Sequence, residues 1–291
     1  MPAKEIPAEL EEVFTTQSEK TRTNYKNMLA RLRTALGVDT PIAVLDPVDI
    51  IKTIREMDVP ASSKASMNTV CHVIFKFHNL DLEKFVKFRD ELAEKAFDES
   101  KVKDTELLSK GITLKTLNDF MAKAFEDKEW VKFVVNYLLI TFQTRNEDVD
   151  LRIISPKDFN KLTEEETKEH NWIVLHKASC MFIRNKYKTA DTYGEKIVII
   201  RNKKLLEALN LIGDGYLLKT GGSHIIPTEL NRAVSNLTYE KMGSTKYFKI
   251  MATFKKNVEK MSSNRGTAPD TIYHNYKLDK KTNLKKKAES L

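Results

Sequence analysis

Apolar residues recur at helical spacing through the first hundred residues and are separated by short polar turns. This pattern predicts four or five short helices and a small all-α domain over residues 1–100. Cap and stop residues bound the predicted helices, namely Thr16 with Glu19 and Gly37 for the first, Asp46 with Pro47 for the second, Ser62 or Ser63 for the third and Asp81 for the fourth.

The pattern changes after residues 101–110, a charged stretch without apolar periodicity that we interpret as a linker. Two helices are predicted next, at 114–124 and 130–142, and the second is the more apolar. Three β-like runs follow at 172–175, 181–184 and 196–200, with a turn at 191–194 between the last two. Helices are expected again at 202–212, 227–240, 245–262 and 268–276. Residues 111–291 are therefore predicted to form a mainly α domain with a small three-stranded antiparallel sheet.

Composition narrows the class of protein. The chain has 291 residues, 41% hydrophobic and 31% charged, which is typical of a soluble globular protein with two domains. It has no long uncharged apolar stretch and an acidic N-terminus, so we expect an intracellular protein without a membrane span or secretory leader. Cys71 and Cys180 lie far apart without a metal-binding motif, which predicts two packed, reduced thiols.

Charge is distributed unevenly between the two halves. Residues 1–100 hold 14 Lys and Arg against 17 Asp and Glu, a net charge of −3, whereas residues 101–291 hold 35 against 24, a net charge of +11. A concentrated basic field favours a polyanionic partner, and nucleic acid is favoured over an anionic membrane because no amphipathic anchor accompanies it. For the lysine-rich end of the chain alone, a solvated charged face is an equally good interpretation.

One segment of the second half combines an apolar helix with an arginine. In LLITFQTRNEDVDL, residues 138–151, Arg145 follows the predicted buried helix and Asp148 lies three residues further on. This segment resembles the first box of the tyrosine-recombinase (phage-integrase) family. A phosphodiester under attack gains negative charge, and a planar guanidinium can bridge two of its oxygens. The resemblance therefore implies that Arg145 stabilises the reacting phosphate.

The predicted hairpin NKYKTADTYGEK supplies the next candidate. The family carries a lysine between its second and third strands that is thought to protonate the leaving 5′ oxygen, and Lys188 matches this position best. Lys186 is the alternative because hairpin length varies. A lysine can act as such an acid only if its surroundings lower its pKa toward neutrality.

The last two boxes of the family match less closely. Where the family has H-x-x-R, this chain has Lys246 and Lys249, so a positive charge is kept while the histidine and the two-pronged guanidinium are lost. Gly266 and Thr267 stand where the family has Gly-His or Gly-Trp, and Tyr276 follows Thr267 by nine residues, the family's spacing for the tyrosine nucleophile. Tyr273, one helical turn earlier, is the alternative nucleophile.

The resemblance implies a two-domain clamp around double-stranded DNA, with residues 1–100 as a SAM-like core-binding domain. It implies strand cleavage and rejoining through a 3′-phosphotyrosyl intermediate, with no metal, cofactor or small-molecule substrate, and a tetramer when assembled on DNA. Further DNA contacts are expected from five basic residues: Arg184, Lys186, Lys255, Lys256 and Arg265.

Two other functions fit the same residues. A catalytically silent DNA-binding or DNA-packaging protein would keep the fold and its basic face while losing the chemistry, as the changes at Lys246, Lys249 and Thr267 allow. An accessory factor of recombination would act through protein contacts alone. The resemblance also makes an integrase of a virus or mobile element plausible.

Overall fold

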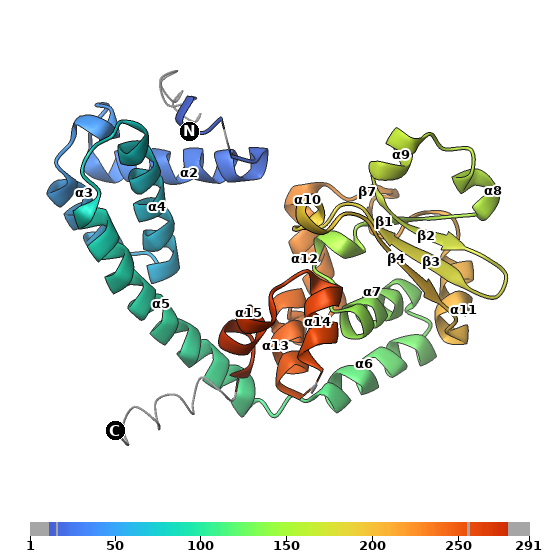
Figure 1. Ribbon diagram of the computed structural model, residues 1–291. Coiled ribbons are helices and arrows are strands. Elements are labelled where there is room, and N and C mark those ends of the chain that lie inside the picture. Colours follow the sequence, from blue (N-terminus) through green and yellow to red (C-terminus); the bar gives the residue numbers. More distant parts are fainter. Residues whose placement is uncertain (1–11, 16, 255–256, 279–291) are drawn as a thin grey trace. The chain divides into compact units, whose positions relative to one another are not determined.

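The computed structural model describes residues 12–15, 17–254 and 257–278. The chain divides into two compact units, Met1–Glu106 and Leu107–Leu291 (Figure 1). Each unit has its own hydrophobic core. It is mainly helical, as predicted. Among the helices that the structure describes, none is both long and apolar enough to cross a membrane.

The first unit is a helical bundle whose main helices are α2 (Glu19–Leu36), α3 (Pro47–Glu56), α4 (Ala61–Phe77) and α5 (Glu83–Ser109). The predicted cap of α3 is confirmed, since the Asp46 carboxylate accepts a hydrogen bond from the Val48 N–H at 2.8 Å. The predicted start of α2 was wrong. Ser18 is its N-cap, with a hydroxyl that accepts from the Thr21 N–H at 3.3 Å, and Thr16 lies outside the described residues.

Most of the predicted linker is helical, because α5 continues through Ser109. Its Lys, Glu and Leu side chains favour helix even though they lack a regular apolar stripe. The core of this unit is formed by apolar side chains from all four helices, including Leu29, Leu32, Ile50, Ile54, Met67, Val70, Ile74 and Phe85.

The second unit contains a five-stranded mixed sheet in the order β4-β3-β2-β1-β5. The three predicted strands form as β2 (Asn171–Leu175), β3 (Cys180–Arg184) and β4 (Lys196–Ile200), paired antiparallel. The expectation of a three-stranded antiparallel sheet was nevertheless wrong, because β1 (Leu151–Ile154) pairs parallel to β2 and β5 (Gly215–Tyr216) pairs antiparallel to β1.

The additional strands β1 and β5 are short and lie among other short elements, so the sequence pattern did not reveal them. The crossover between β1 and β2 contains the helical turns α8 (Pro156–Phe159) and α9 (Glu164–Lys168), and the two-residue strands β6 (Lys219–Thr220) and β7 (Ser223–His224) form a separate hairpin. Strands this short leave no detectable period in the sequence. Where a simple turn was expected between β3 and β4, the chain forms the helical turn α10 (Ala190–Tyr193).

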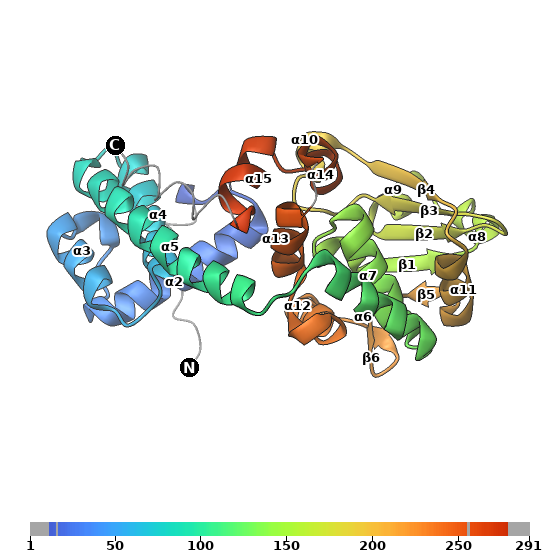
Figure 2. The same ribbon diagram turned by 90° about the horizontal axis from the view of Figure 1, so that it is seen from below.

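In the described part of this unit the longer helices are α6 (Leu114–Glu126), α7 (Trp130–Phe142), α11 (Lys203–Ile212), α12 (Pro227–Leu237), α13 (Ser244–Phe254), α14 (Val258–Arg265) and α15 (Pro269–Asn275). Helix α7 is the central one, in contact with α6, α11, α12, α13 and α14 (Figure 2). Its largely apolar sequence follows from burial on several sides. The single helix predicted at 245–262 is two helices, because α13 ends at Phe254 and Asn257 caps the start of α14.

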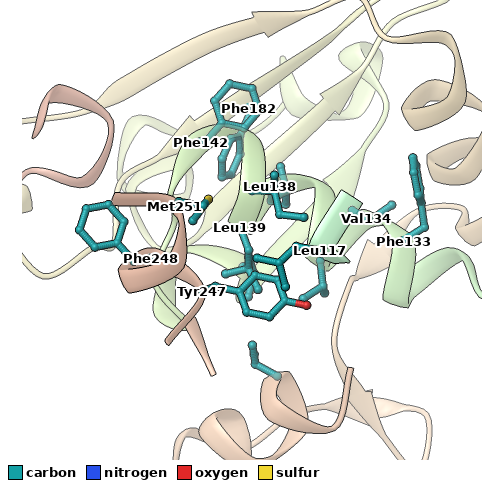
Figure 3. Close-up of a cluster of buried hydrophobic side chains, with 14 of the residues drawn as sticks. Leu117, Phe133, Val134, Leu138, Leu139, Phe142, Phe182, Tyr247, Phe248 and Met251 are labelled. Atoms are coloured by element: carbon teal, nitrogen blue, oxygen red, sulfur yellow. The ribbon is translucent and has the colours of Figure 1, made fainter. Parts of the chain in front are cut away.

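Contacts between α13 and α7 hold the C-terminal helices in place. Tyr247 and Met251 of α13 lie against Leu138 and Leu139 of α7 in the same buried cluster (Figure 3). The Tyr247 hydroxyl donates to the Asn136 side-chain oxygen at 2.6 Å and accepts from the Tyr239 N–H at 2.8 Å. Burial raises the pKa of Tyr247, so this group stays neutral within the core.

Candidate active site

Arg145 is positioned by the turn that ends α7. Gln143 adopts a left-handed conformation with φ 54° and its side-chain amide donates to two carbonyl oxygens of the last turn of α7, which reverses the chain. Arg145 then reaches the end of α14. Its Nη1 donates to the Arg265 carbonyl at 2.6 Å and its Nη2 donates to Thr267 Oγ1 at 3.1 Å. Two positions of the family pattern that are far apart in sequence, Arg145 and Thr267, therefore touch.

Arg184 and Lys196 lie directly opposite each other on β3 and β4. Side chains on alternate residues share a face of a sheet, so both occupy the face that also carries the buried residues Phe182 and Ile200. Arg184 is 1% exposed, and its Nη1 contacts Asp148 Oδ2 at 3.3 Å and the Asn264 carbonyl at 2.8 Å. Burial raises the pKa of Asp148, while the charges of Arg184 and Arg145 oppose that shift.

Lys196 is half-buried at the start of β4. Its Nζ donates to the Ser263 carbonyl at 2.6 Å and lies 5.0 Å and 5.4 Å from the ring centres of Tyr187 and Tyr193. Burial lowers the pKa of Lys196, and the positive charges of Arg184 and Arg145 lower it further, against the opposing charge of Asp148. The pKa of Lys196 is therefore shifted in the direction that a proton-donating lysine needs.

Arg265 is the last residue of α14 and is 3% exposed. Its Nη1 donates to the carbonyl oxygens of Gln143 and Thr144 at 3.1 Å and 3.4 Å. The guanidinium carbon lies 4.0 Å from the Phe248 ring centre. Burial lowers the pKa of Arg265 to about 10, with the charge of Arg145 acting in the same direction and Tyr276 and Asp148 opposing it.

Tyr276 is the C-cap of α15. It is half-buried and lies beside Arg265. Its ring centre lies 4.9 Å from that of Phe248 in an edge-to-face contact and 5.6 Å from the guanidinium carbon of Arg265. The alternative nucleophile Tyr273 contacts a different cation, with Lys277 Nζ 4.2 Å from its ring centre. The arginine-rich side of α15 is therefore the side that carries Tyr276.

The remaining predicted site residues lie away from Asp148 and its cations, or outside the described residues. Lys186, Lys188 and Lys246 are exposed, and Lys249 is half-buried on α13. Four other cations bind at the end of α14 instead. Lys196, Arg184 and Arg145 donate to its last carbonyl oxygens, and Arg265, its last residue, donates to the Gln143 carbonyl. Arg184 and Arg265 were expected to contact DNA, yet both side chains are buried. Lys255 and Lys256 lie outside the described residues.

The sequence KIVII of residues 196–200 has apolar residues on both faces of the strand, so it does not by itself mark Lys196 as a core-facing residue. In Lys196–Ile200 the residues at alternate positions share one face, so Lys196 lies on the same side as Val198 and Ile200, whereas Ile197 and Ile199 point outward. A lysine on the core-facing side of a strand is unusual and indicates a special environment. Lys188, by contrast, lies in the connection between the strands, where a lysine is normally exposed.

No protein-family model, no curated protein and no solved structure matches this chain. Within the described part of the chain, no group of three or more His, Cys, Asp or Glu residues is arranged to hold a metal ion. Cys71 and Cys180 are free and buried, as the sequence predicted, and burial raises the pKa of both thiols to about 12. Among the described residues, the candidate site is thus defined by four cationic side chains around the Asp148 carboxylate, one of which, Arg265, lies beside Tyr276.

Proposed function

We propose that this chain binds duplex DNA and cleaves and rejoins its strands through a 3′-phosphotyrosyl intermediate formed by Tyr276. The observation that carries the proposal is the surplus of positive charge beside that tyrosine. Arg265 lies beside Tyr276, and Arg145, Arg184 and Lys196 act with it on the same carboxylate, Asp148. A partly buried site with more cations than carboxylates favours an anionic ligand, and a phosphodiester has the geometry that guanidinium groups bind well.

The proposed step exchanges one phosphate ester for another. The Tyr276 oxygen attacks phosphorus and forms a P–O bond, the bond from phosphorus to the 5′ oxygen breaks, and the phosphodiester charge is kept. The phenol loses one proton to water, and the leaving 5′ oxygen gains one from a general acid. The reaction therefore needs no redox partner and no net input of protons.

Each cation has a distinct role in this scheme. Arg265 stabilises the negative charge that develops on the Tyr276 oxygen. Arg145 stabilises the additional charge on the phosphate oxygens as the bond to phosphorus forms. Lys196, whose pKa is lowered, donates the proton to the 5′ oxygen. Arg184 is buried and keeps Asp148 and the end of α14 in place.

The proposal assigns most of the DNA affinity to the second unit. The net charge of residues 101–291 is +11, whereas that of residues 1–100 is −3. In the tyrosine-recombinase arrangement, the helical first unit would be the core-binding half of a clamp around duplex DNA, and the assembly on DNA would be a tetramer. Such a protein acts inside the cell, wherever its DNA substrate is.

A catalytically silent DNA-binding protein is the second candidate. It is favoured by Lys246, which is exposed on α13 and replaces the histidine that the family pattern has there. A protein of this kind would bind phosphates with the same cations but would form no covalent intermediate.

Two measurements on the full chain separate these functions. The first is binding to duplex DNA between about 50 and 200 mM salt, across which a protein with several phosphate contacts loses affinity steeply. The second is incubation with nicked duplexes from the surrounding genome, which trap a covalent adduct that denaturing electrophoresis detects. Salt-sensitive binding with an adduct supports the recombinase function, and salt-sensitive binding alone supports the silent DNA-binding protein. A binding constant that hardly changes with salt contradicts both.

A further inference from the structure

The C-terminal end of α14 is held by side chains from other elements. We use the name α14 carbonyl row for the main-chain oxygens of residues 263–266. The last carbonyls of a helix lack partners within the helix and carry the negative end of its dipole. Each oxygen of the row accepts one hydrogen bond, from Lys196 Nζ to Ser263 at 2.6 Å, from Arg184 Nη1 to Asn264 at 2.8 Å, from Arg145 Nη1 to Arg265 at 2.6 Å, and from Thr189 Oγ1 to Gly266 at 3.3 Å.

Two of the cationic donors can be reached from solvent. Arg145 and Lys196 are half-buried, whereas Arg184 and Arg265 are 1% and 3% exposed. An anion that approaches the cluster therefore meets Arg145 and Lys196 first. Both already donate to the α14 carbonyl row, so such an anion competes with main-chain oxygens for the same N–H groups.

Arg145 shows this competition most clearly. Its two terminal nitrogens donate to two oxygens, the Arg265 carbonyl and Thr267 Oγ1. A guanidinium binds two oxygens of a phosphate with the same pair of parallel N–H groups. Two of the five N–H groups of Arg145, one on each terminal nitrogen, thus already donate to oxygens of the chain, so a phosphate that binds these two nitrogens end-on must displace them.

Gly266 allows the α14 carbonyl row to approach its hydrogen-bond donors closely. This residue has φ 63°, and a Cβ atom placed on it would lie 2.4 Å from Thr189 Oγ1 and 3.4 Å from Lys196 Nζ. With any other residue at this position, either the Thr189 side chain or the end of α14 would have to shift. Glycine is therefore what allows the carbonyl row to lie against the cations.

We propose that the α14 carbonyl row is an internal competitor for the phosphate site, and that a phosphodiester binds by displacing the row from Arg145 and Lys196. This inference rests on the proposed function, because it concerns the same cations. A phosphodiester carries a full negative charge, against about half a charge at a helix end, so it is the stronger partner for both cations. Displacement frees the end of α14 and loosens the link to α15, which carries Tyr276. Phosphate binding and the mobility of the nucleophile are thereby coupled.

Hydrogen–deuterium exchange of the full chain tests this coupling directly, with saturating inorganic pyrophosphate in one arm and duplex DNA in the other. We expect peptides covering residues 258–275 to exchange several-fold faster with either ligand, while peptides of α7 are unchanged. Slower or unchanged exchange at residues 258–275 in the presence of bound ligand overturns the proposal, because a phosphate that simply added to the cluster would tighten this region.

A matched pair of variants provides a second test. Thr267→Val removes an oxygen that holds Arg145 and keeps the side-chain shape, so it should strengthen binding of pyrophosphate and of duplex DNA by about fivefold. Thr245→Val changes an exposed threonine of α13 and should leave both affinities unchanged. Weaker or equal binding by Thr267→Val overturns the proposal.

The two arms also separate this inference from the proposed function. If pyrophosphate loosens residues 258–275 but duplex DNA shows no salt-sensitive binding, the carbonyl row is a competitor for some other phosphate compound and the DNA function is wrong. If duplex DNA binds in a salt-sensitive way and residues 258–275 do not loosen, the DNA function stands and the competitor proposal is wrong.

Discussion

Arg184 and Lys196 are two cations that face each other across neighbouring strands on the buried side of the sheet. Like charges directly opposite on adjacent strands normally destabilise a sheet. Here the charge of Arg184 is balanced by Asp148 and by the Asn264 carbonyl, and Lys196 donates to the Ser263 carbonyl. The sheet therefore tolerates this pair only because the end of α14 and Asp148 lie against it.

The first prediction concerns the stability of this arrangement. Arg184→Met should lower the free energy of unfolding by about 3–5 kcal/mol, because it leaves the Asp148 carboxylate buried without its partner. Arg201→Met, at an exposed arginine just after β4, should change it by less than about 0.5 kcal/mol. Denaturant unfolding of both variants measures the difference. Equal, small losses would show that the buried pair does not stabilise the fold.

A second prediction identifies the proton donor. Lys196→Ala should slow adduct formation on ordinary DNA by about 10²- to 10⁴-fold, the usual range for losing a general acid. A substrate with sulfur in place of the leaving 5′ oxygen needs no proton, so it should restore most of the rate. Lys188→Ala, at the exposed lysine, serves as the control and should leave both rates close to those of the unmodified protein. Rescue of Lys188→Ala instead would move the acid to the strand connection.

The pH dependence of cleavage follows from the surroundings of Lys196. Burial, Arg184 and Arg145 lower its pKa from the ordinary value of 10.5, and Asp148 opposes them. A general acid must be protonated, so cleavage of ordinary DNA should fall as the pH rises through this lowered pKa. Cleavage of the sulfur-containing substrate should not show that fall. A common alkaline fall for both substrates would assign the titration to a group other than Lys196.

A fourth prediction separates two effects of glycine replacement. Gly266 and Gly37 both end a helix in the left-handed conformation, with φ 63° and 68°, but an added Cβ would clash only at Gly266, where Thr189 Oγ1 lies 2.4 Å away. Gly37→Ala should cost about 1 kcal/mol from backbone strain, and Gly266→Ala should cost about 1–3 kcal/mol more. Replacing Thr189 by alanine should recover part of the additional loss. Equal losses at the two glycines, measured by denaturant unfolding, would show that the row does not pack as tightly as described.

The sequence predicted the fold where local patterns are strong. A run of β-branched residues located β4, and Asp46 with Pro47 located the start of α3. It did not reveal β5, because a two-residue strand is specified by pairing with β1 rather than by its own pattern. It also predicted one helix through Asn257, because helical spacing continues across the break.

For the candidate site, motif spacing singled out Arg145 and Thr267, whose side chains are in contact, and Tyr276, whose ring lies beside Arg265. It did not locate Arg265 correctly, since an arginine in a basic segment is normally exposed and this one is buried under Phe248. The contacts of the α14 carbonyl row depend on main-chain oxygens, which every residue has. No residue pattern could therefore have indicated them.

The central claim is that Tyr276 attacks a phosphate held by the cluster around Arg145. The most direct measurement is denaturing electrophoresis after incubation with nicked duplexes, using the unmodified protein, Tyr276→Phe, Tyr273→Phe and Arg145→Ala. Tyr276→Phe should abolish the covalent adduct with DNA affinity nearly unchanged, because it removes one oxygen among many phosphate contacts. Arg145→Ala should suppress the adduct and weaken binding, and Tyr273→Phe should keep the adduct. An adduct that persists in Tyr276→Phe and disappears in Tyr273→Phe, or no adduct from the unmodified protein despite tight salt-sensitive binding, would contradict the claim.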